Sequence, residues 1–207
     1  MKQAARKLLI VGIGGTAKAS SSTESALIEA LSSAQRSGAS TRLFGGAFLT
    51  RLPHYLSGDG TLGNEGRELV DAVRRADGLI IAAPGYHGSL SGIVKNAIDY
   101  LEETAKDSRV YLDGLPVGLV ATAYGWQAAS STLAALRSIV HALRGWPTPL
   151  GAALNCSGGI FQDGFCTDET AAAQLRVVGR QVVEFAELKA LARETSLSLF
   201  DRRVGAA

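Results

Sequence analysis

The segment GIGGTAKASSSTES, residues 12–25, concentrates glycines, hydroxyl side chains and one lysine directly after an apolar run. Glycines let the backbone approach an anion closely, and the unpaired N–H groups at the start of a following helix favour negative charge there. Hydroxyl groups and an ammonium group add further donors. These residue types indicate a site for a phosphate monoester, and the candidates are Gly15, Thr16, Lys18, Ser21, Ser22 and Thr23.

Three other interpretations of this segment compete with a phosphate monoester site. GIGGTA also matches the G-x-G-x-x-A pattern of dinucleotide-binding folds, but many hydroxyl residues follow it and the next apolar run, TRLF, ends without an acid. The Gly-Lys-Ser/Thr core of the P-loop pattern is missing from the segment. An ordinary loop with an N-cap serine remains open from these residues alone.

A second segment, PGYHGS, follows the apolar run GLIIAA and precedes a helical pattern. Pro84 is expected to end the strand because it lacks a backbone donor, and serines 89 and 91 are expected to cap the helix. A rigid loop with exposed N–H groups and an aromatic side chain suits a flat heteroaromatic ring. The candidate ring contacts are Pro84, Gly85, Tyr86, His87, Gly88 and Ser89.

A third segment, ATAYGWQ, ends another apolar run and adds four candidates: Thr122, Ala123, Tyr124 and Gly125. Trp126 belongs to the same segment, and two roles for it stay open. It can contact or narrow a ring-binding site, or it can pack in the core. The second tryptophan, Trp146, is expected to pack in the interior.

These segments must be positioned by the elements that precede them. Short apolar runs alternate with helical periods, and this alternation predicts five strand–helix units. The expected strands are 7–13, 40–44, 78–84, 116–123 and 149–155. The expected helical stretches are 26–34, 64–76, 94–101, 133–143 and 175–188, with a loop over 45–63. The pattern predicts one α/β domain over 1–207, with a five-stranded, parallel, doubly wound sheet and helices on both faces.

In such a sheet, ligands bind beyond the carboxyl ends of the strands, at the point where the strand order reverses. The three segments follow the first, third and fourth expected strands. They are therefore expected to lie side by side and to form one site.

The stretch PGYHGSLSGIVKNAIDYL resembles the signature of the NADPH-dependent FMN reductase family, P-x-Y-[HN]-x-S-x-x-G-x-[LV]-K-N-[AL]-[IL]-D. The matching residues are Pro84, Tyr86, His87, Ser89, Gly92, Val94, Lys95, Asn96, Ala97, Ile98 and Asp99. The first segment is similar to the family's phosphate loop, G-S-x-R-x-x-S-x-[NS]. Gly15 and Ser21 match that loop, Thr16 and Thr23 replace small polar residues, and Lys18 replaces arginine.

This resemblance implies a flavodoxin-like three-layer sandwich that binds FMN, with NADPH or NADH as the hydride donor. It places the FMN phosphate at residues 15–23 and the ring over 84–89 and 122–125. It implies no catalytic side chain, because the flavin itself carries the hydride chemistry. A homodimer or homotetramer is implied, paired through helices that include residues 91–101.

The resemblance leaves the electron acceptor open among free flavin, a quinone or another small oxidant, and a flavin-dependent monooxygenase is a possible receiver of reduced FMN. The alternatives are a flavodoxin-like electron carrier and a quinone, azo or chromate reductase of the same fold. Carriers of this type are usually acidic, whereas this chain has a net charge of +2.

The composition narrows the remaining classes. The chain has 207 residues, of which 46% are hydrophobic and 19% charged, so a sizeable core is expected. The mild net charge does not indicate nucleic-acid binding, and no apolar stretch approaches the ~20 residues of a membrane span. Cys156 and Cys166 fit no zinc or thioredoxin spacing, so no metal site is expected. We expect a cytoplasmic protein.

Overall fold

The computed structural model describes residues 6–57 and 61–204, with the backbone alone over 193–204. A parallel sheet forms its centre, in the order β2-β1-β3-β5 followed by β6 and β7, which both pair with β5. The strands are β1 (Leu9–Gly14), β2 (Ser40–Phe44), β3 (Gly78–Tyr86), β5 (Pro116–Ala123), β6 (Trp146–Pro147) and β7 (Ala152–Asn155). This is the 2-1-3-4-5 order of flavodoxin-like sheets, and the predicted fold class is confirmed.

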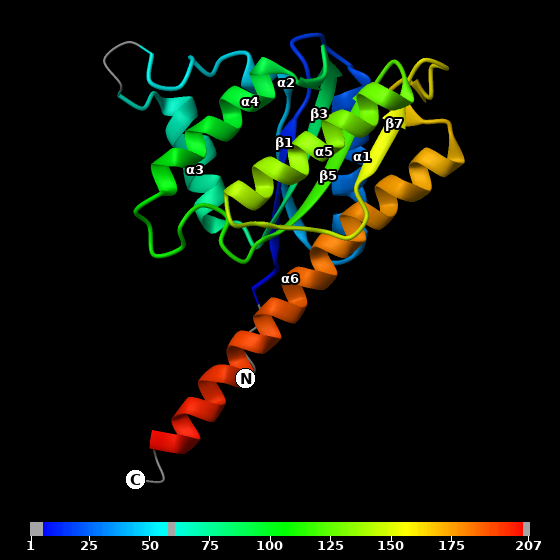
Figure 1. The fold of residues 1–207 in the computed structure, drawn as a ribbon. Helices are drawn as coiled ribbons and strands as arrows, with labels where there is room; N and C mark the ends of the chain where they lie inside the picture. Colours follow the sequence, from blue (N-terminus) through cyan, green and yellow to red (C-terminus); the bar gives the residue numbers. More distant parts are fainter. Residues whose placement is uncertain (1–5, 58–60, 205–207) are drawn as a thin grey trace.

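Helices cover both faces of the sheet (Figure 1). On one face lie α1 (Ser22–Arg36) and α6 (Glu169–Val204), which pack on each other and on the sheet. On the other face lie α3 (Asn64–Arg75), α4 (Gly92–Asp99), the 3₁₀ helix η1 (Tyr100–Thr104) and α5 (Trp126–Ala142). Figure 1 also shows that the last part of α6 projects away from the sheet.

The two faces of the sheet bury two separate apolar clusters because successive strand residues point to opposite sides. In β3, Ile80 packs with the cluster under α1 and α6, and Ile81 with the cluster under α3, α4 and α5. Residues 78–84 are all buried, which is the pattern of a parallel strand covered on both faces. These side chains fix the strand register, since a one-residue shift would exchange the two faces.

The segment 45–63, predicted to be a loop, contains a short helix, α2 (Gly46–Leu49). Four residues are too few to show a helical periodicity, so the hydrophobic pattern did not predict this helix. The helix follows β2 directly, and its N–H and C=O groups bond within the turn, as in the bond from the Leu49 amide to the Gly45 carbonyl at 3.0 Å.

The third strand does not end at Pro84, and that prediction is wrong. Pro84 pairs in register with Thr122 of β5, and the strand continues to Tyr86. Proline lacks an N–H, but its carbonyl still takes part in backbone bonding and accepts the Ser91 amide at 3.1 Å. The strand then turns back through the short antiparallel strand β4 (Ser89–Leu90).

The fifth strand is interrupted rather than continuous over 149–155. Strand β6 pairs with the start of β5 and β7 with its end. The Thr148 amide still donates to the Val117 carbonyl at 3.0 Å, and residues 149–151 leave the sheet between the two strands. Pro149 lies in this gap and cannot donate to a ladder. The amide of Leu150 bonds instead to the Gln181 side chain at 3.1 Å.

A two-stranded hairpin, β8 (Phe161–Gln162) and β9 (Phe165–Cys166), separates β7 from α6. The final helix is far longer than the expected stretch of 175–188, since it runs over Glu169–Val204. Among the helices that the structure describes, none combines the length and apolar character needed to cross a membrane.

Core packing gives the first prediction. Replacing Ile81, which is fully buried in the central strand, by alanine leaves a cavity that the packed sheet cannot close. We expect Ile81→Ala to lower the free energy of unfolding by about 2–5 kcal/mol, measured by urea titration without added cofactor. The control is Ile28→Ala, at a side chain that is 44% exposed on α1, with an expected change of about 0.5 kcal/mol or less. Equal losses in the two variants would contradict the assigned core.

Candidate functional site

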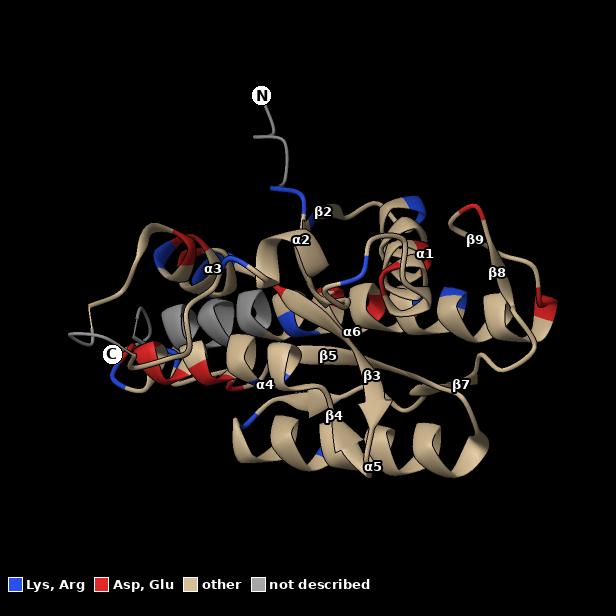
Figure 2. Cartoon of the chain, turned by 90° about the horizontal axis from the view of Figure 1, so that it is seen from above, with Lys and Arg blue, Asp and Glu red and all other residues tan. Residues whose placement is uncertain are grey.

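The three predicted segments meet at one pocket beyond the carboxyl ends of β1, β3 and β5, with a volume of about 180 Å³. The predicted residues that line it are Thr16, Lys18, Ser21, Ser22 and Thr23, then Pro84, Gly85 and Tyr86, then Thr122, Ala123 and Tyr124. Figure 2 looks down on this edge and shows few charges on α5 or on the ends of β3 and β5. The expectation that these segments lie side by side is confirmed.

Five predicted residues lie outside the pocket lining. Gly15 is buried within the first segment, beside Gly46. His87, Gly88 and Ser89 form the exposed end of the β3–β4 hairpin, and Gly125 precedes α5.

Two pocket-lining residues were not among the candidates. Ser20 belongs to the run of hydroxyl residues in the first segment, so the sequence pattern was sufficient to predict it. Cys156 directly follows β7, and its position after a strand was the one sequence feature that could have predicted its place in the pocket. Burial is the main cause that raises the pKa of its thiol, and a hydrogen bond with Ser22 partly offsets the rise. The Cys156 thiol therefore stays protonated at neutral pH.

Residues 16–23, here called the phosphate cradle, end in the N-terminus of α1. Ser21 is the N-cap, and its hydroxyl accepts the Glu24 amide at 3.2 Å. The N–H groups of Ser22 and Thr23 belong to the first turn, so the helix itself offers them no acceptor. Together with the positive end of the helix dipole, these donors make a site for an anion.

Glu24 joins the phosphate cradle to the exit of the second strand. The pair Ser21 and Glu24 fits the capping-box spacing, in which the glutamate would bond back to the N-cap amide. Here its carboxylate instead accepts the amide of Gly46 at 3.3 Å. A Cβ added to Gly46 would lie 1.9 Å from the Thr16 carbonyl oxygen, so α2 and the cradle touch through bare backbone.

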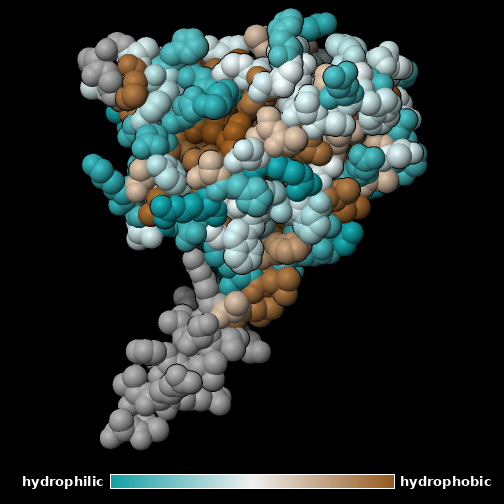
Figure 3. Space-filling model, in the orientation of Figure 1, coloured by the Kyte–Doolittle hydropathy of each residue, from teal (hydrophilic) through white to brown (hydrophobic). Residues whose placement is uncertain are grey.

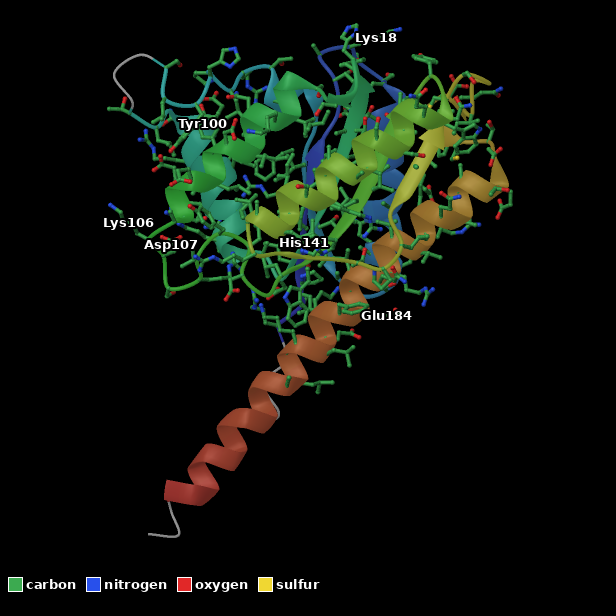
Figure 4. The ribbon with its side chains drawn as sticks, viewed as in Figure 1. Lys18, Tyr100, Lys106, Asp107, His141 and Glu184 are labelled. Atoms are coloured by element: carbon green, nitrogen blue, oxygen red, sulfur yellow. The ribbon has the colours of Figure 1, made fainter. Side chains whose placement is uncertain are left out.

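Lys18 lies at the outer side of the phosphate cradle. The Thr16 hydroxyl accepts the Lys18 amide at 3.2 Å and donates to the Lys18 carbonyl at 3.1 Å, which closes a tight local turn. The Lys18 side chain is exposed at the carboxyl edge of the sheet (Figure 4). Lys18 lines the same pocket as Ser22 and Thr23, so it adds a positive charge on the side of the helix N-terminus.

Residues 84–90, here called the ring shelf, form a hairpin with a two-residue turn. His87 and Gly88 both have positive φ, 49° and 89°, as a type I′ turn requires. Its base packs against α5, where a Cβ on Gly85 would meet the Thr132 hydroxyl at 2.6 Å. Tyr86 is 52% exposed, so its ring is available to a ligand.

The expected capping of α4 is confirmed for Ser91, which is the N-cap residue, and is wrong for Ser89. Ser89 lies in β4, and Ser91 occupies the N-cap position without a side-chain capping bond. Within the described residues, the buried Ser91 hydroxyl has no hydrogen-bond partner.

The third segment presents aromatic rings to solvent beside the pocket. Tyr124 is 83% exposed and Trp126 is 64% exposed, so the core-packing alternative for Trp126 is wrong. The expectation that Trp146 packs in the interior is also wrong, since it is 60% exposed in β6, at the other end of α5.

One buried hydrogen bond connects the first segment to the third. The hydroxyl groups of Thr23 and Thr122 lie 2.6 Å apart, and both side chains are almost fully buried. The bond holds the first turn of α1 against the end of β5, directly at the pocket.

The signature helix α4 has a structural role in the described part of the chain. The Asn96 side chain donates to the Pro53 carbonyl at 2.8 Å and accepts the Tyr55 amide at 2.9 Å, so it fixes the loop after α2. Lys95 and Asp99 form an ion pair at 2.5 Å on the helix surface. Burial and the hydrogen bond to Glu103 raise the pKa of Tyr55 to about 12, so its phenol stays neutral.

The pocket suits FMN better than a metal ion. It offers backbone N–H groups and an ammonium group for a phosphate, and a hairpin with an exposed aromatic side chain for a ring. Among the described residues, no three or more histidine, cysteine, aspartate or glutamate side chains form a cluster that could hold a metal ion.

Comparison with known proteins decides the family. Residues 8–157 match the family described as NADPH-dependent FMN reductase, and this range contains the whole pocket. The chain belongs to the NADPH-dependent FMN reductase family.

Individual relatives agree with this membership. The chain is 34% identical over 122 residues to an FMN-dependent NADPH-azoreductase of Staphylococcus aureus. The aligned region covers 58% of this chain and 61% of the azoreductase. It therefore spans less than two thirds of that relative's length.

Two solved structures support the fold alone. The flavoenzyme NAD(P)H:(acceptor) oxidoreductase FerB from Paracoccus denitrificans matches with a TM-score of 0.68 and 21% identity, over 87% of this chain and 97% of FerB. A flavodoxin from Streptococcus pneumonia TIGR4 matches with a TM-score of 0.55 and 12% identity, over 85% and 98% of the two chains.

The contact between α2 and the phosphate cradle gives the second prediction. Gly46→Ala places a methyl group against the Thr16 carbonyl oxygen, so the cradle must shift. Overpacking of this kind costs about 1–3 kcal/mol, and we expect FMN affinity to fall roughly tenfold. The control is Gly63→Ala, where an added Cβ meets nothing within 4 Å, with unchanged affinity. Isothermal titration with FMN measures both, and wild-type affinity in Gly46→Ala would refute the contact.

Proposed function

We propose that the protein is an NAD(P)H-dependent FMN reductase. In this proposal it binds FMN at the strand-end pocket, and hydride passes from the nicotinamide to the flavin and electrons then pass to a small oxidant. The observation that carries the proposal is the meeting of an anion-binding helix N-terminus and an aromatic hairpin in one pocket. Membership of the FMN reductase family supports it.

The residues of the pocket divide by what they offer a flavin nucleotide. The amides of Ser22 and Thr23 and the Lys18 ammonium group would hold the phosphate. The hairpin at Gly85 and Tyr86 would hold one side of the ring, and the end of β5 at Thr122 would lie beside it. When FMN is bound, it supplies the hydride acceptor and the electron store of the reaction.

The protein's own contribution is then binding and orientation. No side chain needs to act as a base for hydride transfer, and no aspartate or glutamate among the described residues lines the pocket. Holding two rings about 3–3.5 Å apart in the aligned geometry supplies much of the rate enhancement in such reactions. The exposed Tyr86 and Tyr124 border the open side, where a nicotinamide and then an acceptor would enter.

A small aromatic or quinone-like oxidant is the acceptor class that we favour. The similar protein from Staphylococcus aureus is an azoreductase, and FerB is a flavoenzyme NAD(P)H:(acceptor) oxidoreductase. Free flavin is the other acceptor of this class, and reduced FMN would then be available to a flavin-dependent monooxygenase.

The third prediction tests this function directly. Purified protein is mixed with NADPH or NADH, with and without FMN, against a panel of free flavin, a benzoquinone and an azo dye. We expect FMN-dependent oxidation of a nicotinamide with at least one acceptor. Parallel lines in double-reciprocal plots would indicate bound FMN as cofactor, and intersecting lines FMN as substrate. A protein that binds FMN but oxidises neither nicotinamide is an electron carrier, and that result would refute the proposal.

We also propose that the protein pairs with a second copy of this chain. An apolar groove of about 330 Å³ lies between α4 and α5, with Ile98, Ile139 and Leu143 among its lining residues (Figure 3). Lys95 and Asp99 provide charges of both signs at its rim, which suits a two-fold contact where each surface meets itself. The flavin pocket, at about 180 Å³, is below the usual ~300–1,000 Å³ of ligand sites, so a partner subunit can complete it.

The fourth prediction concerns this pairing. We expect the wild-type mass in light scattering to correspond to two or four chains. Ile139→Glu places a charge in the apolar groove and should yield smaller species. Ser138→Glu, at the exposed neighbouring position of α5, should keep the wild-type mass. A monomeric wild type, or an unchanged mass in Ile139→Glu, would contradict the groove as an interface.

A further inference from the structure

The bond between Thr23 and Thr122 leaves one hydroxyl proton unassigned. A threonine hydroxyl carries one proton and can accept as well as donate. The pair therefore has two protons, and the 2.6 Å bond between the oxygens uses only one of them. Among the described residues, no other hydrogen bond is recorded for either hydroxyl.

That remaining proton belongs to groups that are nearly closed off from bulk water. The side chains of Thr23 and Thr122 are 2% and 4% exposed. A buried donor without an acceptor is costly, and such donors are normally satisfied by protein, water or a ligand. Both residues line the strand-end pocket, so the pocket is the place where an acceptor can meet this proton.

The position of the pair within the pocket defines what the acceptor is. Thr23 is the second residue of α1, at the inner end of the phosphate cradle. Thr122 lies opposite Pro84 of the ring shelf in the β3–β5 ladder. A ligand with its phosphate in the cradle and its ring on the shelf therefore passes the pair with the part that joins phosphate to ring, or with the near edge of the ring.

We propose that the Thr23–Thr122 pair donates one hydrogen bond to an oxygen or nitrogen of the flavin that riboflavin and FMN share, on the ribityl chain or the ring. The pair also holds the phosphate cradle in place against the end of β5. This inference rests on the proposed FMN site, and it assigns the two hydroxyls to one coupled donor rather than to two separate phosphate contacts.

The experiment measures the affinities of FMN and riboflavin for the purified 207-residue protein by flavin fluorescence titration. The variants are Thr23→Val, Thr122→Val and the double variant, each of which removes hydroxyl groups at nearly constant volume. At least one single variant should lose roughly 3- to 10-fold in affinity, by the same factor for both flavins. The loss of flavin affinity in the double variant should be no larger than the loss in the more affected single variant, because the pair provides only one hydrogen bond to the ligand.

Three further variants separate this role from folding and from phosphate binding. Thr104→Val removes another buried hydroxyl, which donates to the Leu101 carbonyl at 2.7 Å, and should leave both affinities unchanged. Lys18→Ala should weaken FMN alone, because riboflavin lacks the phosphate. Thr23→Ser restores the hydroxyl and should bind both flavins as the wild type does.

The outcomes distinguish the inference from the function on which it rests. Wild-type affinity for both flavins in the double variant would overturn the inference, and so would a loss restricted to FMN, which would place the pair at the phosphate. Losses that add in the double variant would show two independent contacts and would also overturn it. A wild-type protein that binds neither flavin would instead refute the FMN site itself.

Discussion

The parallel pairing of β1, β3 and β5 in one fixed register is the interaction on which the site depends. Gly14 lies opposite Ala82, and Pro84 lies opposite Thr122, so the ends of three distant chain segments reach the same edge together. The buried side chains on both faces of β3 allow no shift of this register. The sheet thereby determines which loops meet, and the loops determine what they bind.

The strand register does not by itself determine the shape of the loops. Three local contacts determine it. Glycine at position 46 lets α2 touch the phosphate cradle, and Glu24 ties the two together. Packing of Gly85 against Thr132 supports the ring shelf. The Thr23–Thr122 bond joins the cradle to the third segment. A site made from loops of three strand ends is therefore braced by contacts with α2 and α5 and by a hydrogen bond between two of its own segments.

The sequence predicted the sheet well because buried parallel strands are short apolar runs, and the bounds of β2 and β5 match the expected 40–44 and 116–123. It failed where an element is too short or where pairing with a distant strand decides: α2 has only four residues, and β3 continues through Pro84, which pairs with Thr122 of β5. The site segments were predictable from residue types. The partners of Glu24 and Thr23 were not, because they lie far along the chain.

Amide hydrogen exchange with and without FMN tests the central claim most directly, because it reports on all three strand ends at once. The account predicts that FMN slows exchange together in residues 16–24, 85–91 and 123–127. It predicts no change in residues 108–115, which precede β5 at the opposite edge of the sheet. Protection in only one of the three segments, or protection centred on 108–115, would contradict a flavin site built from these strand ends.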